Sequence, residues 1–255
     1  MSPILWNSIP AWPLFFSFAW VLSYFYFKLL LKVTHQYQWI PKLYPFYLGL
    51  YVFGWLGSCI WADILEYNDP HDFGGPLSFY GGVVSGIIYI MIFTLKTKPQ
   101  NIAFTSYFLK LSDYVIPSTL VGLGIGRIGC WLNGDDFGLP LKEDVWWASY
   151  QWIGGHAVPC YPVQWIEIFS CLILGSLIFY MHKKFLKSLT LRLGFIGSCC
   201  GLVSQIVRFL IEFIRGDERV YIIFHLTLPQ LCSLGLSIYF VLVIFLGKRT
   251  KVTLI

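Results

Sequence analysis

The chain has 255 residues, of which 57% are hydrophobic and only 12% are charged, so it lacks the polar surface that a soluble globular protein of this size requires. Several apolar stretches reach the roughly 20 residues that a helix needs to cross a bilayer. The sequence therefore predicts an all-α, polytopic membrane protein. Its net charge of +5 is modest and argues against a nucleic-acid partner, because the basic residues follow the loops between apolar segments.

Seven apolar segments are long enough to be predicted as transmembrane helices. In chain order they lie at about 11–31, 43–65, 75–95, 113–132, 162–181, 191–214 and 224–247. The first is too long for the apolar region of a signal peptide and is followed by Lys28 and Lys32, so it is predicted to be retained. Because no internal repeat is visible, residues 1–255 are predicted to form a single transmembrane domain.

Lysine and arginine are distributed unevenly among the loops. With seven spans, 13 of the 18 basic residues fall on one side of the membrane. Because basic loops stay in the cytoplasm, the amino terminus is predicted to lie outside and the carboxyl terminus inside. The basic side carries Lys28, Lys32, Lys42, Lys96, Lys98, Lys110, Lys183, Lys184, Lys187, Arg192, Lys248, Arg249 and Lys251, and the opposite loops carry Glu66, Asp69, Asp72, Asp135, Asp136, Glu143, Asp144, Asp217 and Glu218.

The seven cysteines include no CxxC pair, and five of them lie inside predicted spans, where they are expected to act as small apolar residues. Cys130 and Cys160 both fall at the outer face, where a disulfide between them is an open alternative in an oxidising compartment. No metal site is predicted, and no cofactor is expected.

The longest outer loop, residues 133–161, is rich in tryptophan and tyrosine, as in "DVWWASYQWIGGHAVPCYP". Aromatic side chains of this kind favour the headgroup level of a membrane. The loop is interpreted either as a lid over a site or as part of an ordinary aromatic belt.

Five charged residues within or at the edges of the spans belong to no solvated loop. An unpaired charge at mid-membrane costs a few kcal/mol, so such residues usually pair or have a function. The alternating direction of the fourth, fifth and sixth spans is expected to bring all five to the outer half of the membrane. They are Arg127, Glu167, Arg208, Glu212 and Arg215.

The segment "QIVRFLIEFIRG" spaces Arg208, Glu212 and Arg215 at i, i+4 and i+7, which predicts one helix face of alternating sign. Three arginines against two glutamates leave one positive charge, and that surplus predicts an anionic ligand. Guanidinium groups bind phosphate through two parallel hydrogen bonds, so a phospholipid headgroup is the leading candidate. The alternative is that these charges only hold helices together.

Three further segments fall on the same outer side. "GGPLSFYGGVVSG" places Tyr80 before two glycines, which allow a backbone or ligand to approach closely. "GRIGCWLNGDDFG" supplies an amide and a carboxylate at Asn133 and Asp135. "YPVQWIE" places Gln164 and Glu167 at i and i+3, on one helix face.

The segment "GRIGCWLNGDDFG" resembles the signature of the bacterial prolipoprotein diacylglyceryl transferases, approximately G-R-x-G-N-F-x-N-G-E-x-x-G. "SFYGG" resembles the family's S-F-H-G-G, "YPVQWIE" its H-P-x-Q-L-Y-E, and "RFLIEFIR" its R-x-x-x-E-F-F-R. The order and spacing of these segments agree with the family from about residue 43 to the end. The signature matches at Gly126, Arg127, Gly129, Asn133, Gly134 and Gly138, with Trp131 for Phe and Asp135 for Glu.

The resemblance implies a seven-helix fold and a reaction. Members of the family transfer the diacylglyceryl group of phosphatidylglycerol to the lipobox cysteine thiol of a preprolipoprotein, forming a thioether and releasing glycerol phosphate. The implied partners are phosphatidylglycerol, the preprolipoprotein signal peptide and membrane lipids, and the implied location is the bacterial plasma (inner) membrane with the active site on the outer-leaflet side.

The resemblance also implies the site residues. Arg127 and Arg208 fall on the family's essential arginines, and Tyr80 and Asp135 complete the expected catalytic set. The residues expected to bind phosphatidylglycerol are Arg127, Asn133, Gln164, Glu167, Arg208, Glu212 and Arg215.

The chain departs from the family pattern at three positions, with Tyr80 and Tyr161 in place of histidines and Cys130 in place of an asparagine. A tyrosine with a pKa of about 10 is a poor base for a thiol. Tyr80 therefore either moves the proton or only donates a hydrogen bond, with Asp135 or Glu167 as other acceptors. Two other functions stay open, a paralogue with the same donor and another acceptor, and a non-catalytic lipid or anion transporter or binding protein.

Overall fold

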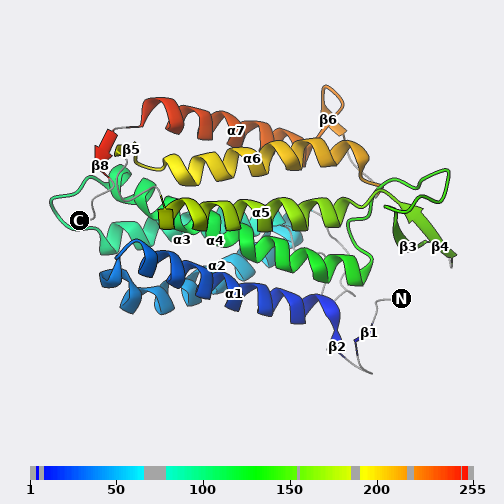
Figure 1. Ribbon diagram of the computed structural model, residues 1–255, viewed down its shortest axis with the longest axis horizontal. Coiled ribbons are helices and arrows are strands. Elements are labelled where there is room, and N and C mark those ends of the chain that lie inside the picture. The colour runs from blue at the N-terminus through cyan, green and yellow to red at the C-terminus, as the bar shows by residue number, and fades with distance from the viewer. Residues whose placement is uncertain are drawn as a thin grey trace. The chain divides into compact units, whose positions relative to one another are not determined.

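The computed structural model describes the backbone of residues 4–5, 9–65, 79–153, 156–184, 190–216, 221–247 and 249–251, and the side chains of residues 14–60, 81–153, 156–183, 192–216 and 224–247. Most of this backbone is helical (Figure 1). The long helices are α1 (Ala11–Val33), α2 (Ile40–Leu65), α3 (Phe79–Thr97), α4 (Phe104–Asn133), α5 (Val163–Lys184), α6 (Phe195–Ile211) and α7 (Leu228–Leu246).

These helices confirm the prediction of a mainly α-helical, polytopic membrane protein. Within the described ranges, six helices are long and apolar enough to cross a bilayer, and large apolar side chains such as Phe18 and Phe169 stay exposed along them. The apolar part of α3 that the structure describes, Gly81–Thr97, is shorter. A seventh span therefore stays a prediction.

Short antiparallel strand pairs, which were not predicted from the sequence, lie between the helices and beyond the first and last of them. The pairs are β1 (Ile4–Leu5) with β2 (Ile9–Pro10), β3 (Ser149–Ile153) with β4 (His156–Cys160), β5 (Thr190–Arg192) with β8 (Arg249–Lys251), and β6 (Tyr221–Ile223) with β7 (Leu226–Thr227). Two short 3₁₀ helices, η1 (Tyr37–Trp39) and η2 (Glu212–Ile214), complete the described elements. Hydropathy detects the apolar helices but carries no signal for pairing in the short connections between them.

The chain divides into two compact units, one made of Met1–Thr34 with Ser112–Ile255 and the other of His35–Leu111. In the second unit, glycines bring α2 and α3 into contact. A Cβ atom at Gly57 would lie 1.8 Å from Ser85 Oγ, and one at Gly82 would lie 2.6 Å from Ser58 Oγ. Because apolar surface provides no driving force between helices in lipid, close approach of this kind is how membrane helices associate. The close approach predicted at Gly82 is therefore that of a neighbouring helix.

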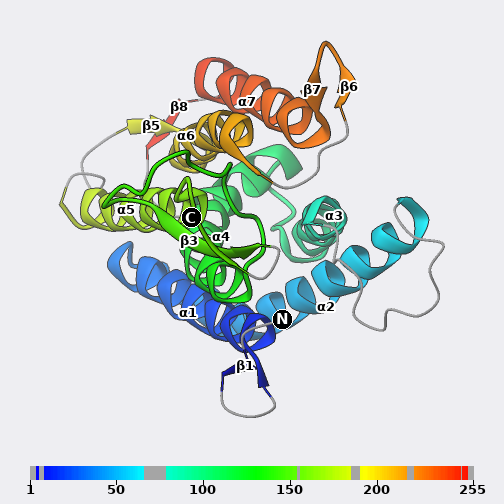
Figure 2. The same ribbon diagram turned by 90° about the vertical axis from the view of Figure 1, so that its right-hand side faces the viewer.

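In the first unit, α4 lies between α1 and α5 (Figure 2). Ser23 Oγ of α1 donates a 2.7 Å hydrogen bond to the backbone oxygen of Ser118 in α4. On the other side of α4, a Cβ atom at Gly124 would lie 3.0 Å from Cys171 Cβ of α5. Small residues and interhelical hydrogen bonds thus hold the central helix that carries the signature segment.

Helix α4 begins at Phe104, earlier than the boundary near residue 113 predicted from hydropathy. Hydropathy falls around Asp113, but this side chain has a partner inside the unit. Its two carboxylate oxygens accept hydrogen bonds from the backbone nitrogens of Gly194, at 2.9 Å, and Gly197, at 2.8 Å. Asp113 therefore satisfies free N–H groups at the amino terminus of α6, where a negative charge is favourable.

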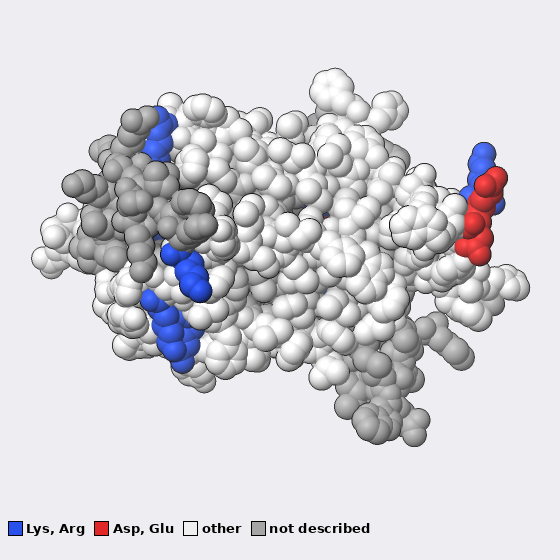
Figure 3. Space-filling model, viewed as in Figure 1, with Lys and Arg blue, Asp and Glu red and all other residues white. Residues whose placement is uncertain are grey.

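Basic and acidic residues separate along the first unit. Lys28 and Lys32 lie near the end of α1 and Lys183 near the end of α5, while Glu143 and Asp144 lie in the connection between α4 and β3. In Figure 3, basic side chains lie toward one end of the face shown, and at the opposite end acidic side chains lie next to a basic one. This is the separation from which the orientation in the membrane was predicted.

Candidate active site

The site forms where the end of α4, the start of α5 and the end of α6 meet. Arg127 lies six positions before the last residue of α4, Glu167 four positions after the first residue of α5, and Arg208 three positions before the last residue of α6. Because α5 runs opposite to α4 and α6, these positions share one end of the first unit (Figure 1). The topology thus brings the three central charged residues together, as the sequence analysis expected.

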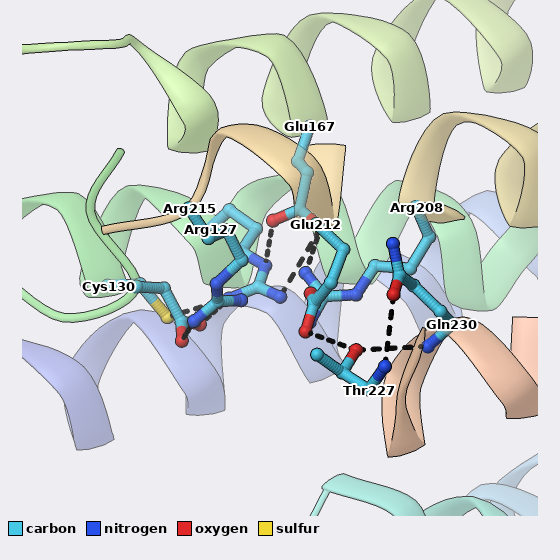
Figure 4. A network of polar contacts seen from close by, with 9 residues as sticks. Arg127, Cys130, Glu167, Arg208, Glu212, Arg215, Thr227 and Gln230 are labelled. Carbon is cyan, nitrogen blue, oxygen red and sulfur yellow. Dashed lines mark hydrogen bonds and ion pairs between the residues drawn. The ribbon is translucent and has the colours of Figure 1, made fainter. Parts of the chain in front are cut away.

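Glu167 lies at the centre of the cluster, between two guanidinium groups (Figure 4). Its Oε2 atom lies 2.7 Å from Nε of Arg127, and its Oε1 atom lies 2.8 Å from Nη1 of Arg208. The side chain of Glu167 is only 6% exposed. A carboxylate buried this deeply requires its counter-charges at hand, and both of its oxygen atoms are engaged.

Glu212 extends the cluster toward α7. Its Oε2 atom lies 3.5 Å from Nη2 of Arg208, the i, i+4 pair predicted from the sequence, and its Oε1 atom accepts a 3.0 Å hydrogen bond from Thr227 Oγ1. Thr227 also caps α7 together with Gln230, in a reciprocal capping box. Neither Thr227 nor Gln230 was predicted to belong to the site, although "TLPQ" has the spacing of a capping box.

The predicted helical face is wrong at Arg215. Helix α6 ends at Ile211, the chain tightens into η2, and Arg215 adopts an extended conformation with φ −77° and ψ 143°. Its buried side chain pairs with Asp136, whose other carboxylate oxygen pairs with Arg127. The register of a continuous α-helix therefore does not determine where this arginine points.

Asp136 is the site residue that the sequence analysis missed. It has a left-handed conformation with φ 56°, shortly after Gly134 with φ 80°, and aspartate is one of the few side chains that accept this region. Burial would raise the pKa of its carboxyl, but the guanidinium groups of Arg127 and Arg215 outweigh burial and hold this pKa well below its usual range. The sequence feature that could have indicated Asp136 is the pair of adjacent aspartates in "GDDFG".

Asp136 corrects the predicted charge of the cluster. Among the described residues, three arginines form ion pairs with three carboxylates, so the expected surplus of one positive charge is wrong. A neutral cluster is what a weakly polar environment favours, because an uncompensated buried charge is costly. The six members are Arg127, Asp136, Glu167, Arg208, Glu212 and Arg215.

Asp135, Asn133 and Gln164 lie beside the cluster. Asp135 is exposed, and its carboxylate accepts a hydrogen bond from Asn133 Nδ2. Gln164 is fully buried and donates from Nε2 to the backbone oxygen of Asp135 at 2.9 Å. Within the described part of the chain, Gln164 Oε1 has no hydrogen-bond partner, so it is a free acceptor next to the signature loop. The catalytic role expected for Asp135 stays a prediction.

Two positions where the chain departs from the family pattern, Tyr80 and Cys130, differ in how much of them the structure describes. The backbone of Tyr80 lies in the first turn of α3, but its side chain lies outside the described residues, so its role stays a prediction. Cys130 accepts a contact from Arg127 Nη1 at 3.7 Å. Cys160 is buried, and burial raises the pKa of its thiol. Both cysteines are free thiols in this structure, which therefore does not contain the disulfide between them.

The loop interpreted either as a lid or as part of an aromatic belt contains the hairpin of β3 and β4. On the buried face of β3, Ser149 Oγ accepts a 3.2 Å hydrogen bond from Trp131 Nε1 of α4. On the other face Trp152 is 71% exposed. Signature residue Gly138 is also explained locally, because a Cβ atom there would lie 2.3 Å from the backbone oxygen of Tyr161. The hairpin is thus anchored on the helix that carries Arg127, with an aromatic surface facing outward.

Comparison with known proteins identifies the family. The family model described as prolipoprotein diacylglyceryl transferase matches residues 4–246. The chain belongs to the prolipoprotein diacylglyceryl transferase family. The match includes α1. It therefore begins earlier in the chain than the motifs, which were found from about residue 43 onward.

Named relatives of this transferase family agree with that assignment. The chain is 30% identical over 188 residues to phosphatidylglycerol–prolipoprotein diacylglyceryl transferase 2 of Clostridium perfringens (strain 13 / Type A), which is 70% of this chain and 68% of the relative. It is 24% identical over 273 residues to the phosphatidylglycerol–prolipoprotein diacylglyceryl transferase of Buchnera aphidicola subsp. Acyrthosiphon pisum (strain 5A), covering 93% of each. A Leptospira interrogans protein of the same name is 29% identical over 151 residues, which is 58% of this chain but only 44% of the relative.

Proposed function

We propose that this chain transfers the diacylglyceryl group of phosphatidylglycerol to a cysteine thiol of a prolipoprotein. Membership in the prolipoprotein diacylglyceryl transferase family and the names of the relatives support this function. The structural observation that carries it is the pair of guanidinium groups, from Arg127 and Arg208, held on the two oxygens of Glu167 at the end of the helix bundle. Arginine side chains fixed in this way can bind a phosphate group without further ordering.

The reaction forms one bond and breaks one. The acceptor sulfur bonds to the terminal glyceryl carbon of the diacylglycerol moiety, and the bond between that carbon and the phosphate oxygen breaks. The bonding electrons leave with the oxygen as glycerol phosphate, and the thiol proton passes to a base or to water. A phosphate monoester has a second pKa of about 6, so it departs without a strong acid if its charge is stabilised.

Arg127 and Arg208 are assigned to that stabilisation. Their side chains are only 10% and 17% exposed, and preorganised charges in a poorly hydrated site act more strongly on developing charge than charges in water. Glu167 orients the two guanidinium groups, because both of its oxygen atoms are engaged by them. Gln164 Oε1, a buried acceptor, suits a hydroxyl of the glycerol headgroup.

The proton acceptor is assigned to Asp135, and Tyr80 is given a different role. Asp135 is exposed and close in sequence to Asn133, to which it is hydrogen-bonded, so it can exchange protons with water. Tyr80 occupies the position of a family histidine, and we assign it a hydrogen bond to the phosphate ester, because a phenol is poorly matched to a thiol proton.

The same proposal includes the membrane setting. The chain is a seven-span protein of the bacterial plasma (inner) membrane, with the amino terminus outside and the site on the outer-leaflet side. The basic ends of α1 and α5 face the cytoplasm, in agreement with the positive-inside rule. The hairpin of β3 and β4 serves as a lid whose exposed aromatic side chains lie at the headgroup level.

The decisive experiment uses the purified chain with phosphatidylglycerol and a lipobox peptide. We expect thioether formation and release of glycerol phosphate with the cysteine peptide, and neither product with the matched serine peptide. Movement of lipid between leaflets without glycerol phosphate release would instead support a transporter, and release with a different thiol acceptor would support a paralogue.

A further inference from the structure

The charge balance of the cluster constrains how an anion can enter it. Asp136, Glu167 and Glu212 compensate the three arginines of the cluster, as described above. A phosphodiester carries one negative charge, so its addition would leave one uncompensated negative charge in a poorly hydrated region. An uncompensated charge there is costly. The cost disappears if one carboxylate moves out of the cluster when the phosphate binds to the arginines.

Of the three carboxylates, Asp136 is best placed to move away from its arginine partners. Its side chain is 29% exposed, compared with 6% for Glu167 and none for Glu212. Glu167 is fixed on α5 between two arginines, and Glu212 is also held by Thr227. Asp136 lies in a connection rather than a helix, and its short side chain is partly exposed.

The backbone at Asp136 is held in place, so only its side chain has to move. The backbone nitrogen of Leu139 donates to Ile214 at 2.8 Å, and that of Gly216 donates to Phe137 at 2.9 Å. These two hydrogen bonds tie the residues after Asp136 to the segment that carries Arg215. A change of side-chain rotamer is therefore enough to move the carboxylate from the arginines to the aqueous layer.

We propose that Asp136 is an internal anion, which occupies the phosphate-binding edges of Arg127 and Arg215 in the lipid-free protein and is displaced from them by the phosphate of the donor. This inference rests on the proposed function, because it takes the donor to be an anionic phospholipid. Asp136 falls on a variable position of the family signature, so the resemblance does not assign it a role.

The exchange would make Asp136 a determinant of donor specificity. An incoming group must compete with a carboxylate already paired with two guanidinium groups. A tetrahedral phosphate, which offers several oxygen atoms to two planar forks, can do so, whereas a weakly binding anion such as chloride cannot. The apparent affinity for the donor is then the intrinsic affinity multiplied by the fraction of molecules in which Asp136 is not paired with Arg127 and Arg215.

The first test replaces Asp136→Asn and compares it with Asp144→Asn, which removes the same charge from the exposed part of the same connection. Binding of inorganic phosphate and of glycerol phosphate is measured from the concentration dependence of the unfolding temperature in detergent. If the arginines are vacant in roughly a tenth of parent molecules, Asp136→Asn should bind both anions about tenfold more tightly. It should also lower KM for phosphatidylglycerol more than it changes kcat, and Asp144→Asn should bind like the parent.

The second test needs no substitution at Asp136. In the parent chain, carbodiimide labelling of carboxyl groups is mapped by mass spectrometry with and without phosphatidylglycerol in nanodiscs. Displacement predicts that labelling of Asp136 increases severalfold when phosphatidylglycerol replaces a neutral lipid, while labelling of Asp144 stays constant. A static counter-ion would be labelled equally in both, or less with phosphatidylglycerol.

The outcomes separate this inference from the proposed function. Unchanged or weaker anion binding by Asp136→Asn, or unchanged labelling of Asp136, would overturn the exchange while leaving phospholipid transfer intact. Absence of phosphate and phosphatidylglycerol binding in both the variant and the parent would overturn the anionic donor site itself, and the exchange with it.

Discussion

Glu167 and Arg208 lie 41 positions apart in the sequence, yet a carboxylate oxygen of Glu167 lies 2.8 Å from a guanidinium nitrogen of Arg208. The pair joins the start of α5 to the end of α6, and the second oxygen of Glu167 holds Arg127 from α4. One carboxylate thus sets the positions of both arginines that we assign to the leaving phosphate.

Replacement of Arg208 by lysine should abolish most transfer. Lysine keeps the charge but lacks the planar fork, so it cannot hold Glu167 and a phosphate in the same geometry. We expect a loss on the order of 100-fold or more in kcat/KM for phosphatidylglycerol. Arg192→Lys, at the end of β5 just before α6, is the matched control and should retain activity. Near-normal transfer by well-expressed Arg208→Lys would show that the fork is not needed.

Replacement of Tyr80 by phenylalanine should have a small effect. If the hydroxyl only orients the phosphate ester, its loss costs roughly 0.5–1.5 kcal/mol, or about tenfold or less in rate. Tyr80→His should stay active, since imidazole titrates near neutrality. The measurement is single-turnover thioether formation on a lipobox peptide from about pH 6 to about pH 9. Complete loss in Tyr80→Phe, with normal phospholipid binding, would identify Tyr80 as the base.

Thr227→Val should destabilise the protein and weaken the site together. The substitution keeps the shape but removes both the cap of α7 and the hydrogen bond to Glu212. Loss of a helix cap costs about 1 kcal/mol, and loss of the hydrogen bond to Glu212 adds to that cost. Thermal unfolding in detergent measures the change, and Thr227→Ser, which keeps the hydroxyl, should behave like the parent. Equal stability of the valine and serine variants would contradict the role of the cap.

The ion pairs of Asp136 should survive mild acid. Its pKa is held well below the unfolded value of about 3.9, so the pairs contribute stability above that value and lose it as the pH falls through the folded pKa. The difference in unfolding temperature between the parent and Asp136→Asn should therefore be constant from about pH 5 to about pH 8 and shrink below about pH 4. A difference that vanishes near pH 6 would argue against an ionised Asp136.

The orientation in the membrane can be tested with reporter fusions. A reporter fused after Lys251 should be cytoplasmic, and one inserted near Glu143 should be external, because the basic residues concentrate on one side of the spans. Two reporters on the same side would place the arginine cluster away from the outer leaflet and remove the proposed access to the acceptor.

The helices and the central charged residues of this protein follow from the sequence alone. Apolar runs of about 20 residues predict spanning helices, because the unpaired backbone cannot be hydrated in lipid. An arginine or glutamate inside such a run must find a partner for the same reason, so Arg127, Glu167 and Arg208 could be assigned to one site before their contacts were known.

Only the tertiary structure decided which partners complete that site. Arg215 leaves the helical register in η2, and backbone hydrogen bonds join its segment to the loop after α4, which brings Asp136 against it. Thr227 reaches Glu212 because the first turn of α7 lies beside η2. Periodicity predicts contacts along one helix, whereas these contacts form between connections, whose conformations depend on left-handed residues and on pairing between segments far apart in the chain.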